Sequence, residues 1–211
     1  INRVLYNMVE SVNYAVYQAK KYLIARAILE GQMYPMQVPT VTKENASTVT
    51  TIIKKNIDDM KFPSRKFNLA NVMTSTRPED LYVIVNTEFA SVNDVEVLAQ
   101  AFNMDKAQFL NVKQLLVDSF GNLDTEWLNS MFGSQPGYEE IKESDLELLD
   151  AVPAVIVARN YLISRPFKRW HDDIRNPQYA SINHFEHFWY IMGVSPFANA
   201  ALATVVTPAV T

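Results

Sequence analysis

The stretch INRVLYNMVESVNYAVYQAKKYLIARAILEG, residues 1–31, decides the fold because it predicts one uninterrupted helix. Its apolar side chains recur every three or four positions, the spacing that places them on one helical face. Gly31 stands where a helix end favours a left-handed backbone. A helix over residues 1–30 would be about 45 Å long, well beyond the roughly 10–14 residues of an average globular helix. Such a helix belongs either to a bundle or coiled coil, or to an elongated subunit that it crosses as a strut.

A break and a second helix follow this first helix. Two prolines within residues 34–40 favour an extended connector. Residues 43–60 predict a helix, with Thr42 as its N-cap. The expected buried stripe of this helix consists of Ala46, Val49, Ile53, Ile57 and Met60.

The middle of the chain alternates strand and helix patterns. Short apolar runs rich in branched side chains favour buried strands. Ser91 and Asp94 stand in the spacing of a capping box, which predicts that a helix opens at Ser91. The expected elements are an irregular segment over 61–80, a strand over 81–85, a helix over 92–102, a helical turn over 105–109, a strand over 112–117, an exposed loop over 129–145 and a strand over 155–158.

The last third of the chain predicts strands. Residues 168–174 and 178–192 are expected to form two long antiparallel strands joined at 175–177, and residues 198–206 a final strand. Both faces of the long pair carry large side chains, so we expect burial on both sides, at least one of them by another subunit. The order of helix, mixed middle and strands predicts an α+β protein.

The composition excludes several classes of protein. A compact monomer of 211 residues and 24.1 kDa would expose about 10,000 Å². The net charge of −4 argues against a general nucleic-acid binder, and the absence of cysteine excludes thiolate sites. The five glycines form no phosphate-binding motif, and no apolar run has the roughly 18–20 residues that span a bilayer. No hydrolase elbow of the form G-x-S-x-G is present.

The histidines offer one candidate metal centre, built from His171, His184, Glu186 and His187. On a strand, His184 and Glu186 share a face while His187 lies on the other face, and the adjacent Asp172 and Asp173 likewise diverge. This division argues against a metal site. We therefore expect no catalytic, cofactor-binding or metal-binding residues and keep a metal-dependent enzyme as an alternative.

Four stretches, taken in order, indicate a family. They are RPEDLYVIV at 77–85, DVEVLAQAFNM at 94–104 continuing to Phe109 and Leu110, IRNP at 174–177, and VSPFANA at 194–200 followed by an apolar strand and the tail 206–211. Together with the preceding long helix, they resemble the major capsid proteins of tailed bacteriophages, particularly those of small podoviruses. The likeness covers most of residues 77–211, whereas residues 1–76 resemble the family in architecture only.

The resemblance implies the Hong Kong ninety-seven capsid fold. Residues 1–41 and 165–192 would form its peripheral domain, with residues 1–30 as the spine helix. Residues 42–164 and 193–211 would form its axial domain. Family members carry an N-terminal arm and an extended loop before the spine helix, and neither is present in this sequence. We therefore expect that an N-terminal portion is missing from the chain.

The resemblance also implies a function. The chain would be a structural protein without enzymatic activity or cofactor that assembles into the pentamers and hexamers of a phage head. Its partners would be copies of itself, a scaffolding protein, a portal at one vertex and packaged double-stranded DNA that is bound without sequence readout, with no membrane contact. It would be assembled in the bacterial cytoplasm and reside in the virion. The alternatives are an encapsulin-like compartment of the same fold, the metal-dependent enzyme and a coiled-coil adaptor.

Overall fold

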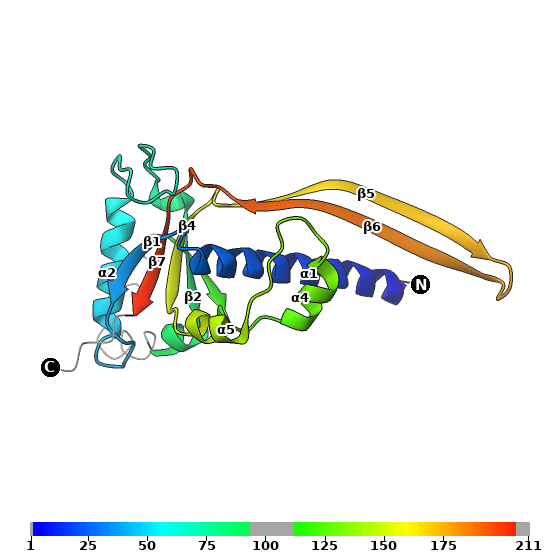
Figure 1. The fold of residues 1–211 in the computed structure, drawn as a ribbon, viewed down its shortest axis with the longest axis horizontal. Helices are drawn as coiled ribbons and strands as arrows, with labels where there is room; N and C mark the ends of the chain where they lie inside the picture. Colours follow the sequence, from blue (N-terminus) through cyan, green and yellow to red (C-terminus); the bar gives the residue numbers. More distant parts are fainter. Residues whose placement is uncertain (1, 93–111, 206–211) are drawn as a thin grey trace.

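The computed structural model describes residues 2–92 and 112–205 as an α+β chain drawn out along one axis (Figure 1). A five-stranded sheet lies at one end, and a long helix and a long hairpin reach from it toward the other end. The elements are α1 (Asn2–Leu29), β1 (Tyr34–Val38), α2 (Ala46–Asp59), the 3₁₀ turn η1 (Pro78–Asp80), β2 (Leu81–Asn86), β3 (Lys113–Val117), α4 (Thr125–Phe132), α5 (Glu143–Asp150), β4 (Ala154–Ala158), β5 (Leu162–Asn176), β6 (Ser181–Val194) and β7 (Ala200–Val205).

The expected first helix is confirmed as α1, and Gly31 after it has a left-handed φ of 66°. Burial divides this helix into two parts. From Gln18 onward most residues are buried or half-buried, whereas Tyr6 and Val9 are 64% and 48% exposed. The C-terminal part of α1 therefore packs into the body, while its N-terminal part projects from it. This arrangement fits a helix that crosses an elongated subunit better than a helix buried in a bundle.

The five-stranded sheet has the order β1-β7-β4-β2-β3. β4 runs antiparallel to β7 and β2, and β1 and β3 pair in parallel with β7 and β2 at the two edges. The expected connector at 34–40 is corrected here, because residues 34–38 form an edge strand. Pro35 fits this position, since an edge strand has one row of N–H groups that need no ladder partner.

Two helix starts also differ from the sequence prediction. α2 begins at Ala46 after Asn45 instead of at 43 after Thr42, although the whole expected stripe on it is buried. Residues 87–92 are already helical, so Ser91 lies inside that helix and does not open it. Asn86 is the residue that caps it, because its Oδ1 accepts a hydrogen bond from the Phe89 N–H at 2.7 Å. The rest of the expected helix at 92–102 and the turn at 105–109 lie outside the described residues.

The expected loop at 129–145 is shorter in the structure and covers 133–142, because α4 and α5 occupy its two ends. Both helices have local start signals. The Asp124 carboxylate accepts a hydrogen bond from the Trp127 N–H at 3.0 Å, and the Asp145 carboxylate accepts one from the Lys142 N–H at 3.2 Å. Side-chain caps of this kind fix short helices that hydrophobic periodicity alone does not reveal.

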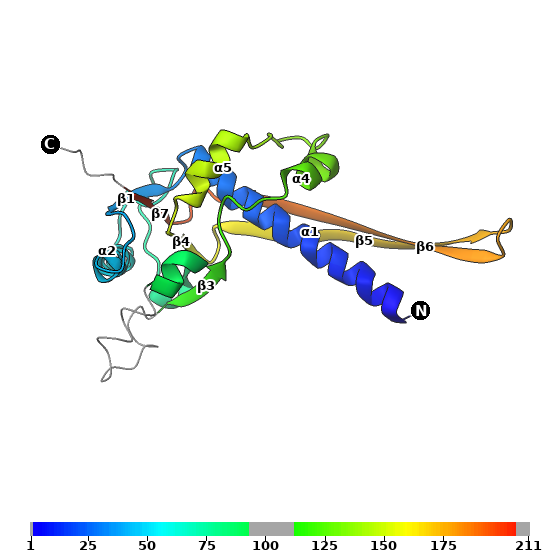
Figure 2. The ribbon, with the colours of Figure 1, turned by 90° about the horizontal axis from the view of Figure 1, so that it is seen from below.

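The expected long antiparallel pair is confirmed as the β5–β6 hairpin, but its bounds are corrected: β5 begins at Leu162 instead of 168, the turn lies at 177–180 instead of 175–177, and β6 begins at Ser181 instead of 178. It forms a separate two-stranded sheet that reaches past the exposed end of α1 (Figures 1 and 2). The accessible surface of the chain is 13929 Å², about 40% more than a compact monomer of this mass would expose. The compact value expected from length alone is therefore wrong, and the projecting hairpin and the outer part of α1, which carry many exposed side chains, contribute to the difference.

Candidate functional site

The long hairpin has two faces of different character. Successive side chains on a strand point to opposite faces, and the register pairs Trp170 with His187, Asp172 with Phe185 and Lys168 with Trp189. One face therefore gathers large apolar side chains, each between 41% and 60% exposed. We call this set the aromatic face: Ile163, Trp170, Ile174, Phe185, Trp189 and Ile191.

The aromatic face points away from the body of the chain. Leu162 and Val194 pair with each other on the opposite face and pack against the hydrophobic core. No described residue outside the hairpin covers Trp170 or Trp189, which remain 51% and 60% exposed. The burial on both faces that the sequence predicts is thus not supplied by the described part of this chain, and a large apolar patch of this kind marks a contact surface.

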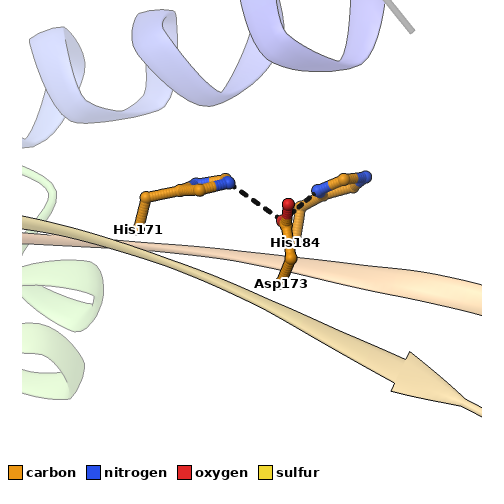
Figure 3. A group of neighbouring side chains, drawn as sticks. All are labelled: His171, Asp173 and His184. Carbon is orange, nitrogen blue, oxygen red and sulfur yellow. Dashed lines mark hydrogen bonds and ion pairs between the residues drawn. The ribbon is translucent and has the colours of Figure 1, made fainter.

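The opposite face gathers charge farther along the hairpin. We call the set Arg169, His171, Asp173, His184 and Glu186 the charged face. His171 and Asp173 lie on β5, and the register places them opposite Glu186 and His184 on β6. In Figure 3 the side chains of His171, Asp173 and His184 rise from the hairpin on the side where α1 lies.

Short contacts connect the charged face into one chain of ion pairs. Arg169 Nε lies 3.1 Å from Glu186 Oε2, and Glu186 Oε1 lies 2.8 Å from His171 Nδ1. His171 Nε2 is 2.9 Å from Asp173 Oδ1, which is also 2.5 Å from His184 Nδ1. The cluster joins the two strands at both carboxylates, since Glu186 on β6 contacts Arg169 and His171 on β5, and Asp173 on β5 contacts His184 on β6.

The charged face shifts the acid–base properties of its carboxyl groups. The hydrogen bond with His184, aided by the charge of His171, holds the pKa of Asp173 below its ordinary value. The hydrogen bond from Arg169 and its charge do the same for the pKa of Glu186. Both carboxylates are therefore ionised at neutral pH, a state in which they accept hydrogen bonds or coordinate a cation.

The structure divides the candidate metal residues as a strand requires. It brings His171, His184 and Glu186 together and places His187 on the aromatic face opposite Trp170. Asp173 is the member that sequence reasoning missed. Its neighbour Asp172 lies on the aromatic face, where its carboxylate accepts a hydrogen bond from Trp170 Nε1 at 2.7 Å. Only the hairpin register, which the sequence does not give, shows that Asp173 faces His184.

A buried lysine holds α1 against the body from which the hairpin projects. Lys21 Nζ donates to Asp118 Oδ1 and to the Asn122 carbonyl, each at 2.6 Å, and the lysine side chain is only 4% exposed. Burial is the largest single effect on the pKa of Asp118 and acts to raise it, but the hydrogen bond and charge of Lys21 together with hydrogen bonds from Ser119 and Asn122 outweigh it, and the net shift is downward. One turn later, Arg26 pairs with Glu139 in the loop between α4 and α5. These bonds fix the angle at which the strut leaves the sheet.

Comparison with known proteins points to one family. Residues 1–204 match the sequence model of the family described as Phi29-like phage major capsid protein. The major capsid protein of Bacillus phage PZA is 24% identical over 200 residues, which are 92% of this chain and 38% of that protein. The major capsid protein of Streptococcus phage Cp-1 is 30% identical over 132 residues, 63% of this chain and 31% of that protein. The chain thus spans well under half of the length of these relatives.

Solved structures show the same fold. The capsid structure of Staphylococcus phage Andhra contains a chain that matches with a TM-score of 0.67 at 17% identity, covering 97% of this chain and 63% of that one. A chain in the structure of the head fiber and inner core protein gp22 of native bacteriophage P68 matches with a TM-score of 0.66 at 14% identity, covering 95% and 62%. At these identities the likeness establishes the fold alone. None of the helices within 2–92 and 112–205 has the length and apolar character to cross a membrane.

Proposed function

Because the chain belongs to the Phi29-like phage major capsid protein family, we propose that it forms the shell of a phage head by assembling with copies of itself into pentamers and hexamers. The match over residues 1–204 carries this proposal, since it covers nearly the whole chain. The shell encloses double-stranded DNA and binds it without sequence readout, which agrees with the net charge of −4.

We propose a division of the chain into two structural parts. The peripheral part combines α1 with the β5–β6 hairpin, and the axial part contains the five-stranded sheet with α2, α4 and α5. The family resemblance implied that residues 34–41 are peripheral, but β1 pairs with β7, so residues 34–41 belong to the proposed axial part. The peripheral part then consists of residues 1–33 and 165–192, and the remaining residues are axial.

The aromatic face is the proposed contact between neighbouring copies. Its six large apolar side chains stand on the side of the hairpin away from the core, and the described part of the chain leaves them uncovered. A shell needs lateral contacts on an extended, rigid body, and the hairpin with α1 forms such a body (Figure 1). If each copy contacts the next through two different surfaces, head to tail, the copies close into rings, as the pentamers and hexamers at the vertices require.

The remaining roles follow from the same proposal. A scaffolding protein directs assembly in the bacterial cytoplasm, a portal occupies one vertex, and the finished chain resides in the virion. The protein acts structurally, without a catalytic centre or cofactor. An encapsulin-like compartment is the alternative of the same fold, and a packaged enzyme in place of DNA would distinguish it.

Electron microscopy tests the proposal directly. The complete open reading frame is expressed with and without the neighbouring gene that encodes the candidate scaffolding protein. We expect closed shells of uniform diameter with five-fold and six-fold clusters, formed efficiently only with the scaffold. Well-folded protein that stays monomeric, or that forms only small defined oligomers under both conditions, would contradict the capsid function. Shells that form alone and fill with one enzyme would support the compartment.

A further inference from the structure

We propose that the charged face of the hairpin binds one divalent transition metal ion such as Zn²⁺, through His171 Nε2, Asp173 Oδ1 and His184 Nδ1. These three ligand atoms all lie within 4.8 Å of one another. Imidazole nitrogens with one carboxylate oxygen form a donor set typical of zinc, whereas calcium and magnesium prefer oxygen donors alone. The proposal is independent of shell formation, since all three ligands come from one chain.

The geometry requires only small side-chain movements to accept the ion. Zinc bonds of about 2.0–2.2 Å in a tetrahedral arrangement separate neighbouring donor atoms by about 3.3–3.5 Å. Asp173 Oδ1 now lies 2.9 Å from His171 Nε2 and 2.5 Å from His184 Nδ1. The ion takes the place of the protons shared between these atoms, and the protons are released to solvent. The two rings are close to parallel, with an angle of 20° between their planes, so neither blocks the other.

A second layer of side chains orients the first ligand. Glu186 Oε1 accepts the proton of His171 Nδ1 at 2.8 Å, which leaves Nε2 as the atom that can bind a metal ion. Arg169 holds Glu186 in turn at 3.1 Å, and the Glu186 side chain is only 12% exposed. A carboxylate that fixes the tautomer of a ligating histidine is a common feature of protein zinc sites. Surface ion pairs that form by chance would not be expected to line up so that Arg169 holds Glu186 and Glu186 in turn orients His171.

The surroundings leave a coordination position open. The side chains of His171, Asp173 and His184 are 45%, 50% and 47% exposed, so an ion can enter from solvent. Three protein ligands leave the fourth tetrahedral position for water or for an added ligand. Because the ligands come from both strands, the bound ion would join β5 to β6 along the projecting part of the hairpin.

The chain offers a matched control for the test. It contains only three histidines, and the third, His187, lies on the opposite face of the same hairpin. The experiment uses tag-free, full-length protein and isothermal titration with ZnCl₂, with far-UV circular dichroism to confirm that each variant folds. We expect one Zn²⁺ per chain. His171→Ala and His184→Ala should each weaken binding at least about tenfold, and Glu186→Gln should weaken it about tenfold through loss of orientation. His187→Ala should leave the affinity unchanged.

Nuclear magnetic resonance of the imidazole groups locates the ion without relying on variants. Zn²⁺ should shift the signals of His171 and His184 and leave those of His187 in place, and excess Mg²⁺ should cause neither effect. Absence of saturable binding would overturn the proposal. Equal weakening by His187→Ala and His171→Ala would also overturn it, as would Mg²⁺ competing at similar concentration.

Discussion

At the scale of single residues, two buried tyrosines differ in whether the side-chain hydroxyl forms hydrogen bonds. Tyr22 on α1 donates a hydrogen bond to the Glu139 carbonyl at 2.8 Å and accepts one from the Glu139 N–H at 2.9 Å. Tyr161, only 2% exposed, has no hydrogen-bond partner for its hydroxyl among the described residues. Burial, with a smaller contribution from the charge of Glu30, raises the pKa of Tyr161 to about 12. The first hydroxyl holds the strut in place, whereas the second adds desolvation cost.

This contrast predicts opposite effects of the same substitution. Tyr161→Phe should raise the free energy of unfolding by about 1 kcal/mol, because it removes a buried polar group that makes no bond. Tyr22→Phe should lower it by about 1–2 kcal/mol, because two hydrogen bonds are lost. Chemical denaturation of the two variants beside the parent chain measures both. Equal destabilisation by the two substitutions would show that the Tyr161 hydroxyl has a partner after all.

The Lys21–Asp118 pair predicts a pH-dependent stability. Asp118→Asn should destabilise the chain by about 1–2 kcal/mol at pH 7, a range reduced because Asp118 is half exposed. The folded-state pKa of Asp118 is lowered, so its contribution is present above its ordinary pKa of about 4 and is lost as the pH falls through the lower folded value. The stability difference between parent and variant should therefore shrink below about pH 4.

The control for this experiment is the exposed pair of Lys61 and Asp58, 2.5 Å apart on the surface of α2 and the turn after it. Asp58→Asn should change the free energy of unfolding by no more than about 0.5 kcal/mol, because exposed pairs contribute little. Denaturation curves for both variants at several pH values make the comparison. An effect of Asp118→Asn that matched the control at pH 7 would show that Lys21 needs no counter-charge.

At the scale of secondary structure, the sequence predicted the elements that have a strong period and missed elements that lack one, such as the edge strand β1 and the short helices α4 and α5. The 28 residues of α1 and the apolar run of β2 were predictable because each repeats one local pattern. Strand β1 was not, because its pairing with β7 joins residues some 167 positions apart, from Tyr34 to Ala201. The start of α2 was missed because Thr42 and Asn45 are both residue types that begin helices, and the sequence alone does not choose between them.

In the candidate site, the sequence could likewise predict what a local pattern fixes, but not which residues lie opposite each other on the two strands. Alternation along a strand correctly separated His187 from His184 and Glu186. It could not bring in Asp173, since that requires the register between strands, which is set by the turn at 177–180. A one-residue slip of β6 would have moved His184 and Glu186 to the face opposite to that of Asp173. Residues on one strand were thus assigned correctly, and the pairing across strands was not.

The loop after β3 approaches α5 so closely at Gly121 that replacing this glycine should destabilise the fold. A Cβ on Gly121 would lie 2.4 Å from the Leu146 carbonyl oxygen and 2.5 Å from Asp150 Oδ1. Gly121→Ala should therefore cost about 1–3 kcal/mol, since backbone must move to make room. Gly193→Ala in β6 is the control, because a Cβ there meets nothing within 4 Å. Thermal unfolding of both variants measures the difference, and equal melting temperatures would contradict the packing argument.

At the scale of the whole molecule, the shape itself argues for assembly. An accessible surface of 13929 Å² leaves this chain with about 40% more exposed area than a compact protein of its mass. The hairpin and the outer part of α1, which project together from the body (Figure 2), contribute to that excess with many exposed side chains. A lone chain gains no stability from such a projection. Neighbouring copies that cover its apolar side would convert the exposed area into binding energy.

The aromatic face therefore predicts that assembly and folding can be separated by substitution. Replacing Trp170 and Trp189 together by serine should leave the stability of the monomer nearly unchanged, because both side chains are more than half exposed in the chain. In the shell, losing this area should weaken each contact by about 3 kcal/mol. That loss corresponds to about a hundredfold rise in the protein concentration needed for assembly. Sedimentation and electron microscopy of the full-length variant with its scaffold measure both quantities.

The matched control for the double variant is Ile182→Ser, on the other face of the hairpin and 58% exposed. It removes a similarly exposed apolar side chain and should leave the yield of shells close to that of the parent. If the double variant assembles as well as this control, the aromatic face does not hold neighbouring copies together and another surface must do so. If both variants fail equally, the hairpin contributes through its overall shape, because loss of either face would then matter. Failure of the double variant alone assigns the contact to the side of the hairpin that faces away from α1.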